Sequence, residues 1–252
     1  MADPRPLTIV VNKKGPEDII DEIFPLRYGT YSEVFTEDYR FVFNLNGEVK
    51  TVSGSKSSWP HPGEQLKRTD GNDWIYYSVG DDSSDQGVRS WLGEYYLPCL
   101  SYPSNPIWLI DFFSKPVVMQ AYAAWYQLYS NLAKMDKEGM RPEEKAFVDR
   151  VVSMNDDALR DRAKELHGII GGRVSVLPPD TRHVDYEVIP LNIADGCLYH
   201  CDFCCVKTDN SFQVRSQELV AGQIQQLKEY HGGNIINYKA LFLGNHDALA
   251  AG

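Results

Sequence analysis

The sequence lacks an apolar segment that could cross a membrane, since no stretch approaches the roughly 18 uninterrupted apolar residues that a span requires. Residues Met1–Pro6 also lack the apolar core of an export signal. Basic residues are in the minority, because 25 Lys and Arg stand against 35 Asp and Glu, a net charge of −10. Non-specific binders of nucleic acid or anionic membranes need a basic face, so neither partner is expected. We expect a soluble, cytoplasmic protein.

Cysteine is scarce and unevenly placed. The chain has five, of which four lie between Cys197 and Cys205 while Cys99 stands alone. A secreted disulfide scaffold has an even number of cysteines spread along the chain, so that class is excluded. Clustered thiols in a cytoplasmic protein more often hold a metal, whereas the lone Cys99 is expected to be a small buried apolar residue.

The 252 residues, 43% of them hydrophobic, suffice for one large domain or two ordinary ones. Residues 1–180 are predicted to form an α+β accessory domain of unknown role, with strands and loops to about 110 and helices over about 115–170. The turn Asn46-Gly47 predicts a hairpin over 39–52, and 74–79 reads as another strand. Ser114, Pro142 and Asn155 are the expected helix starts. The fold class is therefore α/β overall.

An acidic stretch lies between Thr69 and Val88, where five Asp residues occur without Lys or Arg. The ordered alternation and closing Glu of a calcium-binding EF-hand are absent. We interpret the stretch, which includes Asp70, as a loop exposed to solvent.

A strand–helix–strand pattern follows the linker at 177–180 and defines the second domain, residues 181–252. Residues 184–193 predict a buried strand, Ser216 caps a helix with Leu219, Val220, Ile224 and Leu227 facing inward, and 239–243 predict a second buried strand. Such a βαβ unit makes the two strands parallel, and ligands bind at the carboxyl ends of such strands. The cysteine-rich loop and the loop Gly244–Asp247 both follow carboxyl ends, so both should lie at the same place.

The cysteines form the motif C-x3-C-x2-C at Cys197, Cys201 and Cys204, with Phe203 before the last one. Three thiolates can hold an iron–sulfur cubane and leave one iron open to a small molecule. The motif, on a loop after a buried strand, resembles the radical S-adenosylmethionine (radical SAM) superfamily.

That resemblance implies a partial (β/α) barrel and a [4Fe–4S] cluster held by the three cysteines. It also implies S-adenosylmethionine (SAM) on the open iron, and a one-electron donor of the flavodoxin or ferredoxin type. Reductive cleavage of SAM would give a 5′-deoxyadenosyl radical that abstracts hydrogen from a substrate that the sequence does not identify. Phe203 would lie near the adenine. Gly244, Asn245 and Asp247 stand where the family has a Gly-Gly-Glu turn that contacts the cofactor amino group.

Alternatives to this cluster stay open. Three of the loop cysteines could bind zinc with His200, His231 or His246, although no second pair of ligands at zinc spacing occurs. Such a protein would be a non-catalytic binding module.

The roles of three further residues near the motif are also open. Cys205 could act as a fourth cluster ligand. Lys207 or Arg215 could neutralise the cofactor carboxylate.

The C-terminal part of the sequence holds only one βαβ unit. Each unit of a (β/α) barrel takes about 30 residues, and the family barrel has six. We therefore expect this chain to be the front part of a longer protein, or the strand 239–243 to have its apolar edge covered by another element.

Overall fold

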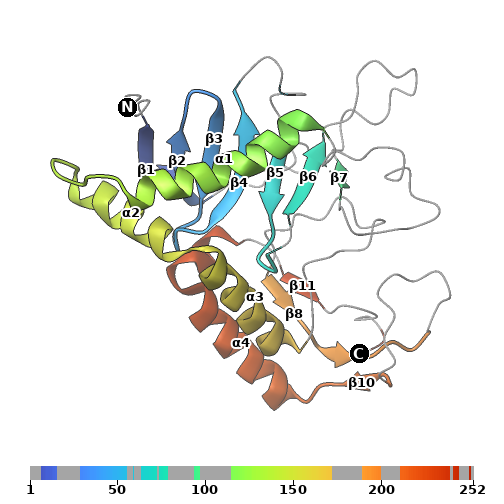
Figure 1. Ribbon diagram of the computed structural model, residues 1–252. Helices are drawn as coiled ribbons and strands as arrows, with labels where there is room; N and C mark the ends of the chain where they lie inside the picture. The colour runs from blue at the N-terminus through green and yellow to red at the C-terminus, as the bar shows by residue number, and fades with distance from the viewer. Residues whose placement is uncertain are drawn as a thin grey trace.

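The computed structural model describes residues 7–15, 29–55, 59, 64–72, 74–78, 94–96, 115–171, 189–199, 211–238, 241–243 and 250 (Figure 1). Seven antiparallel strands come first and form one sheet in which each strand pairs with its neighbour in the sequence. They are β1 (Thr8–Lys14), β2 (Thr30–Phe35), β3 (Tyr39–Phe43), β4 (Val49–Gly54), β5 (Gln65–Arg68), β6 (Trp74–Ser78) and β7 (Glu94–Tyr96).

The hairpin predicted at Asn46-Gly47 is confirmed, since β3 and β4 pair antiparallel on either side of it. Gly47 has a φ of 84°, a conformation that costs glycine little. A Cβ at this position would also lie 2.7 Å from the carbonyl carbon of Arg150. The turn therefore packs directly against a helix, and only glycine fits there.

Three helices follow the sheet: α1 (Pro116–Ala133), α2 (Pro142–Ser153) and α3 (Asp156–Ile170). Pro142 opens α2 and the Asn155 side chain caps α3, as predicted. The expected cap at Ser114 is wrong, because the N-cap of α1 is Lys115. Pro116 is the first helical residue and restricts the residue before it to extended backbone, which fixes the start one position later.

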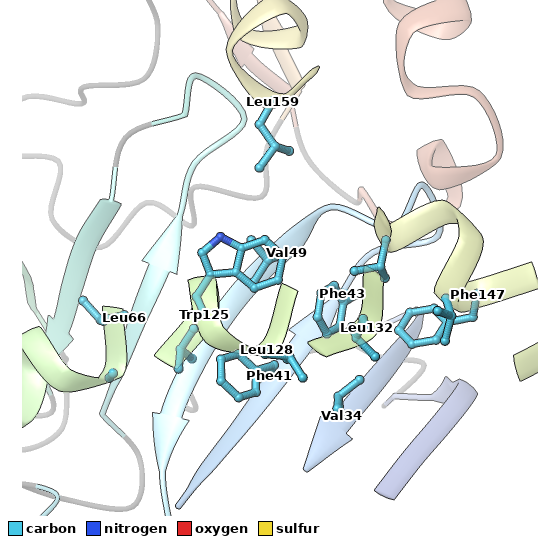
Figure 2. Packing of buried hydrophobic residues seen from close by; sticks show 14 of the residues in the cluster. Val34, Phe41, Phe43, Val49, Leu66, Trp125, Leu128, Leu132, Phe147 and Leu159 are labelled. Carbon is cyan, nitrogen blue, oxygen red and sulfur yellow. The ribbon is translucent and has the colours of Figure 1, made fainter. Parts of the chain in front are cut away.

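The main core lies between the sheet and helices α1 and α2, which cover one of its faces (Figure 1). Trp125 of α1 packs against Phe43 of β3 with ring centroids 5.9 Å apart, and Phe147 of α2 lies 5.4 Å from the same ring (Figure 2). Trp125 therefore lies in the main core. Tyr126, by contrast, is 41% exposed.

The C-terminal part contains the predicted βαβ unit. Its elements are β8 (Ile189–Leu191), β9 (Ala194–Asp195), β10 (Gln213–Val214), α4 (Gln217–His231), the 3₁₀ helix η4 (Gly232–Asn237) and β11 (Leu241–Leu243). β8 and β11 are parallel, with Ile189 opposite Leu241 and Leu191 opposite Leu243. Ser216 caps α4 and Gly232 ends it, as expected.

The predicted inward face of α4 is partly wrong. Leu227 is buried, but Leu219 and Ile224 are 64% and 39% exposed. The buried face is instead Gln223, Leu227 and Tyr230, which recur at helical spacing. The polar Gln223 takes a buried position because its amide bonds to backbone, a role that an apolar pattern does not show.

Helix α3 belongs to two cores. Leu159 near its start lies in the main core, whereas Leu166 and Ile170 near its end pack with Leu191 and Leu227. Helices α3 and α4 lie side by side below the large sheet (Figure 1). The boundary predicted near residue 180 falls outside the described residues. Among those described, β8 and β11 form a two-stranded pair, so the fold is a mixture of α and β without a barrel.

Within the described ranges, no helix has both the length and the apolar character needed to cross a lipid bilayer.

Candidate functional site

The cysteine loop starts at the carboxyl end of β8. Because β8 and β11 run parallel, the segment after β11 leaves the same edge of the pair. This edge is the one at which the sequence predicts both the cysteine loop and the turn Gly244–Asp247. Gly244, Asn245 and Asp247 themselves lie outside the described residues, so their part in a site stays a prediction.

Cys197 is the described member of the motif. Its thiol is free and half-buried, and Leu198 and Tyr199 beside it are 55% and 68% exposed. Gly196 before it has a φ of 73°, which lets the chain turn sharply out of β9. A free, accessible thiol at the edge of a parallel pair has the chemistry of a soft-metal ligand.

Cys201, Phe203, Cys204 and the neighbouring Cys205 lie outside the described residues, as do Cys99, Lys207, His200 and His246. Among the described residues, no three His, Cys, Asp or Glu side chains are grouped as metal ligands. Cys197 is therefore the member of the motif that the structure describes, and the role of the three cysteines as cluster ligands stays a prediction.

A buried amide pair fixes where β8 ends. The Asn192 N–H donates to Oε1 of Gln223 at 2.8 Å, and Nε2 of Gln223 donates to the Asn192 carbonyl at 3.0 Å. Gln223 thus satisfies both backbone groups of a residue that has left the strand. The Asn192 side chain in turn donates to the Ile170 carbonyl at 2.8 Å, at the end of α3. No apolar pattern in the sequence marks this pair, because both side chains are polar and lie far apart in the chain.

The base of the cysteine loop is closed by β9 and β10, which pair antiparallel. The Arg215 guanidinium donates to both carboxylate oxygens of Asp195, from Nε at 2.9 Å and from Nη2 at 2.5 Å. Arg215 was predicted to face the cofactor carboxylate. That role stays a prediction, and the partner that the structure gives its guanidinium is Asp195.

A second polar cluster lies at the opposite end of the βαβ unit, where α4 runs into η4. Asp70 accepts from Nζ of Lys50 at 2.7 Å and from the Tyr238 hydroxyl at 2.6 Å. Asp70 is therefore buried, and the interpretation of its stretch as a solvent-exposed loop is wrong at this residue. Its partners come from a sheet strand and from the far end of the chain, which a local charge pattern does not reveal. Asp73, Asp81, Asp82 and Asp85 lie outside the described residues.

His231 belongs to this cluster and not to the cysteine loop. Its ring packs between those of Tyr230 and Tyr238, at 4.9 and 4.5 Å between centroids. It ends α4, whereas Cys197 lies near the end where α4 begins, because a crossover helix runs antiparallel to its strands. This position does not support His231 as a zinc ligand.

Burial and ion pairing shift the pKa values of His231 and Asp70 in this cluster. Burial lowers the pKa of His231, against the opposing influence of the Asp70 and Glu48 carboxylates. Burial alone would raise the pKa of Asp70, but the charge of Lys50 and the hydrogen bonds from Lys50 and Tyr238 outweigh it and hold that pKa well below its usual range. These shifts favour a neutral imidazole beside an ionised carboxylate, which is an arrangement for stability at neutral pH.

A cleft of about 900 Å³ lies elsewhere, between the β2–β3 turn and α1. Phe41 and Leu128 line its apolar floor, and Glu37, Asp38 and Lys134 stand on its rim. Among the described residues that line the cleft there is no cysteine or histidine, so the cleft shares no side chain with the predicted cysteine site.

Comparisons of the chain with protein-family models, with curated proteins and with solved structures found no match. The function is therefore argued from the chemistry of the cysteine loop and from the place of that loop in the fold.

Proposed function

We propose that this chain binds a [4Fe–4S] cluster through Cys197, Cys201 and Cys204 and works with SAM as a radical SAM enzyme or as the N-terminal part of one. The observation that carries the proposal is the position of the C-x3-C-x2-C motif. Cys197, its first residue, follows β8 by way of the short strand β9, and β8 pairs in parallel with β11, the strand after α4. Ligands and cofactors bind at that edge in α/β folds.

The described residues support cluster binding through Cys197. Its thiol is free and half-buried, so its sulfur is accessible to a metal. Three thiolates leave one iron open, and SAM would take that position. When bound, the cluster supplies the electron that cleaves the sulfonium of SAM reductively. The electron itself would come from a donor of the flavodoxin or ferredoxin type.

The residues proposed to hold SAM come from the resemblance to the radical SAM family, and the direction of β11 agrees with that assignment. The segment after β11 leaves the edge at which Cys197 lies, which favours Gly244, Asn245 and Asp247 as contacts of the cofactor amino group. Phe203 within the motif is proposed to pack near the adenine. A cytoplasmic location belongs to the proposal, because that compartment keeps thiols reduced.

The proposal also treats β8 and β11 as the first strands of a partial barrel. Leu241 and Leu243 are 60% and 48% exposed, and β8 is the neighbour of β11 among the described strands, which supports an edge that a further element would cover. Natural sheets cover such an edge, and a further strand would do so. The substrate is not identified by these residues.

Anaerobic reconstitution of the full chain with iron and sulfide tests the cluster. About four irons per chain are expected, together with the brown colour of a cubane. Cys197→Ala, Cys201→Ala and Cys204→Ala should each abolish iron binding, and Cys205→Ala and Cys99→Ala are the matched controls that should retain it. Loss of the cluster in Cys205→Ala would overturn the open-iron site. Stoichiometric zinc in a colourless anaerobic sample would instead support a zinc-stabilised binding module.

The cofactor half of the proposal has its own test. Equilibrium dialysis of the reconstituted protein with labelled SAM should show binding that Asp247→Asn weakens without changing the iron content. The matched control is Asp202→Asn, since Asp202 is not assigned to the cofactor. Equal SAM binding by wild type and Asp247→Asn would remove Asp247 from the site.

A further inference from the structure

The sequence places all four clustered cysteines between β9 and β10, and these two strands pair with each other. The ladder there is short, with Ala194 opposite Val214 and Asp195 opposite Gln213. Closing a loop costs conformational entropy, and a two-residue ladder offers few hydrogen bonds against that cost. Something further has to hold the ends together.

Arg215 adds further hydrogen bonds between the two ends. Its backbone N–H donates to the Ile193 carbonyl at 3.0 Å, which extends the pairing by one residue. Its guanidinium holds both carboxylate oxygens of Asp195, and the Arg215 side chain is only 13% exposed. A bidentate, partly buried pair of this kind is stronger and more directional than a surface ion pair.

The end of α3 completes the arrangement. Gly171 caps α3 with a φ of 78°, and a Cβ at that position would lie 2.4 Å from Nη2 of Arg215. The carbonyl end of a helix carries partial negative charge, which favours a guanidinium there. The neighbouring Ile170 carbonyl accepts from Asn192 on the other flank of the loop. One helix end therefore fixes both sides of the loop base.

We infer that Arg215 is a positioning residue that closes the cysteine loop by clamping Asp195 against the end of α3, so that the thiolates are held together for metal. This inference rests on the proposed function for its metal, but the closure of the loop is a property of the chain itself. It assigns Arg215 to the base of the loop, and not to the cofactor carboxylate.

The first measurement uses the metal-free protein. Trypsin should cut after Lys207, within the loop, about tenfold faster in Arg215→Gln than in wild type, since a charge-assisted pair no longer opposes opening. Arg215→Lys should fall between the two, because lysine keeps the charge and loses the bidentate geometry. Arg160→Gln is the matched control, since it removes an arginine from the exposed pair with Asp157 on α3.

The second measurement uses the reconstituted protein. Iron release to a chelator should be about tenfold faster in Arg215→Gln, the scale on which lost outer-shell partners weaken metal sites. The exchanged pair Asp195→Arg with Arg215→Asp should recover part of the wild-type retention. A purely structural role would lower the thermal midpoint and leave the rate of iron release unchanged.

The two measurements distinguish a failure of the proposed function from a failure of the inference about Arg215. If wild type takes up no iron, the proposed function fails, while the trypsin measurement still decides whether Arg215 closes the loop. Equal cleavage after Lys207 in wild type and Arg215→Gln would overturn the inference even if iron binds. Should Arg215→Gln fail to fold by circular dichroism, Asp195→Asn tests the same clamp from the more exposed partner, and equal cleavage there would overturn it as well.

Discussion

The two parts of the molecule differ in how much apolar area holds them together. The sheet and helices α1 and α2 enclose a continuous apolar core with Trp125 and Phe43 at its centre (Figure 2). Among the described residues, the βαβ unit has a smaller apolar cluster, and polar pairs such as Asn192–Gln223 and Arg215–Asp195 fix the end of β8 and join β9 to β10. The sheet also buries ion pairs such as Lys50–Asp70, so the two parts differ in the extent of apolar burial and not in the presence of polar pairs.

This difference matters for a site. Apolar contacts are non-directional, so a core tolerates small shifts of its side chains. Hydrogen bonds to backbone fix a strand end or a loop base within narrow limits, and they become costly when one partner is lost. In the part that carries Cys197, the end of β8 and the pairing of β9 with β10 are fixed in the second way. Substitutions in the two parts should therefore differ in size and in what they disturb.

The largest effect is expected from Trp125→Ala in the main core. Trp125 is 2% exposed and packs on Phe43, so its removal leaves a cavity and should lower the free energy of unfolding by about 3–5 kcal/mol. Urea denaturation measures this loss. Met119→Ala on the same helix, at 48% exposure, is the control and should cost less than about 1 kcal/mol. Equal losses would show that the apolar core is not the main source of stability.

A smaller but more local effect is expected from Gln223→Leu in α4. The substitution keeps the volume and leaves the N–H and carbonyl of Asn192 without their partner, at a cost of about 1–3 kcal/mol. It should also speed the cleavage of the loop by trypsin, because the end of β8 is no longer fixed. Gln225→Leu removes an exposed bond to Glu229 on the same helix and should do neither. A stabilised Gln223→Leu protein would contradict the role of the amide pair.

Acid should weaken the junction that contains His231 and Asp70. The pKa of His231 is lowered from 6.5 in the folded protein, so the unfolded chain binds a proton first as the pH falls. Stability is then complete above about pH 6.5 and falls as the pH drops towards the folded value. Asp70 acts in the same direction at lower pH, since its folded pKa is also lowered and its stabilising charge is lost on protonation.

Urea denaturation at pH 7.5 and pH 5.5 tests this dependence. Wild type should be less stable at the lower pH, and His231→Gln should reduce the difference between the two values. The His167→Gln protein is the control, because His167 lies in the last turn of α3. A difference that His231→Gln leaves unchanged would place the acid response in other groups.

The smallest effect is expected on the exposed face of α4. Leu219→Ser should change the free energy of unfolding by less than about 0.5 kcal/mol, because Leu219 is 64% exposed. Leu227→Ala on the buried face should cost about 2–5 kcal/mol. Similar costs at the two positions would mean that Leu219 is covered in solution.

Local signals predicted much of the fold. Asn46-Gly47 gave the hairpin, Pro142 and Asn155 gave helix starts, and the strand–helix–strand pattern gave the parallel pair of β8 and β11. Each of these depends on residues close together in the chain. The edge at which Cys197 lies follows from the same pattern, since strand direction fixes it.

The features that the sequence does not predict depend on contacts between residues that are far apart in the chain. Asp70 is buried because Lys50 and Tyr238, separated from it by 20 and 168 positions, meet it in space. Gln223 faces inward because the end of β8 needs an amide there, so a rule based on apolar spacing selected Ile224 instead. The pairing of Arg215 with Asp195 depends on the register of β9 and β10, and no residue type in the sequence predicts that register.

Helix α3 has a consequence for cooperativity. Its first half contributes Leu159 to the main core, and its second half contributes Leu166 and Ile170 to the small one. Neither core can lose this helix and stay intact, so the two parts should melt together in a single transition. A fragment that started at the predicted boundary near residue 180 would leave its own supporting helix behind. The part of the chain that folds cooperatively is therefore longer than the segment from residue 181 that carries the cysteine motif.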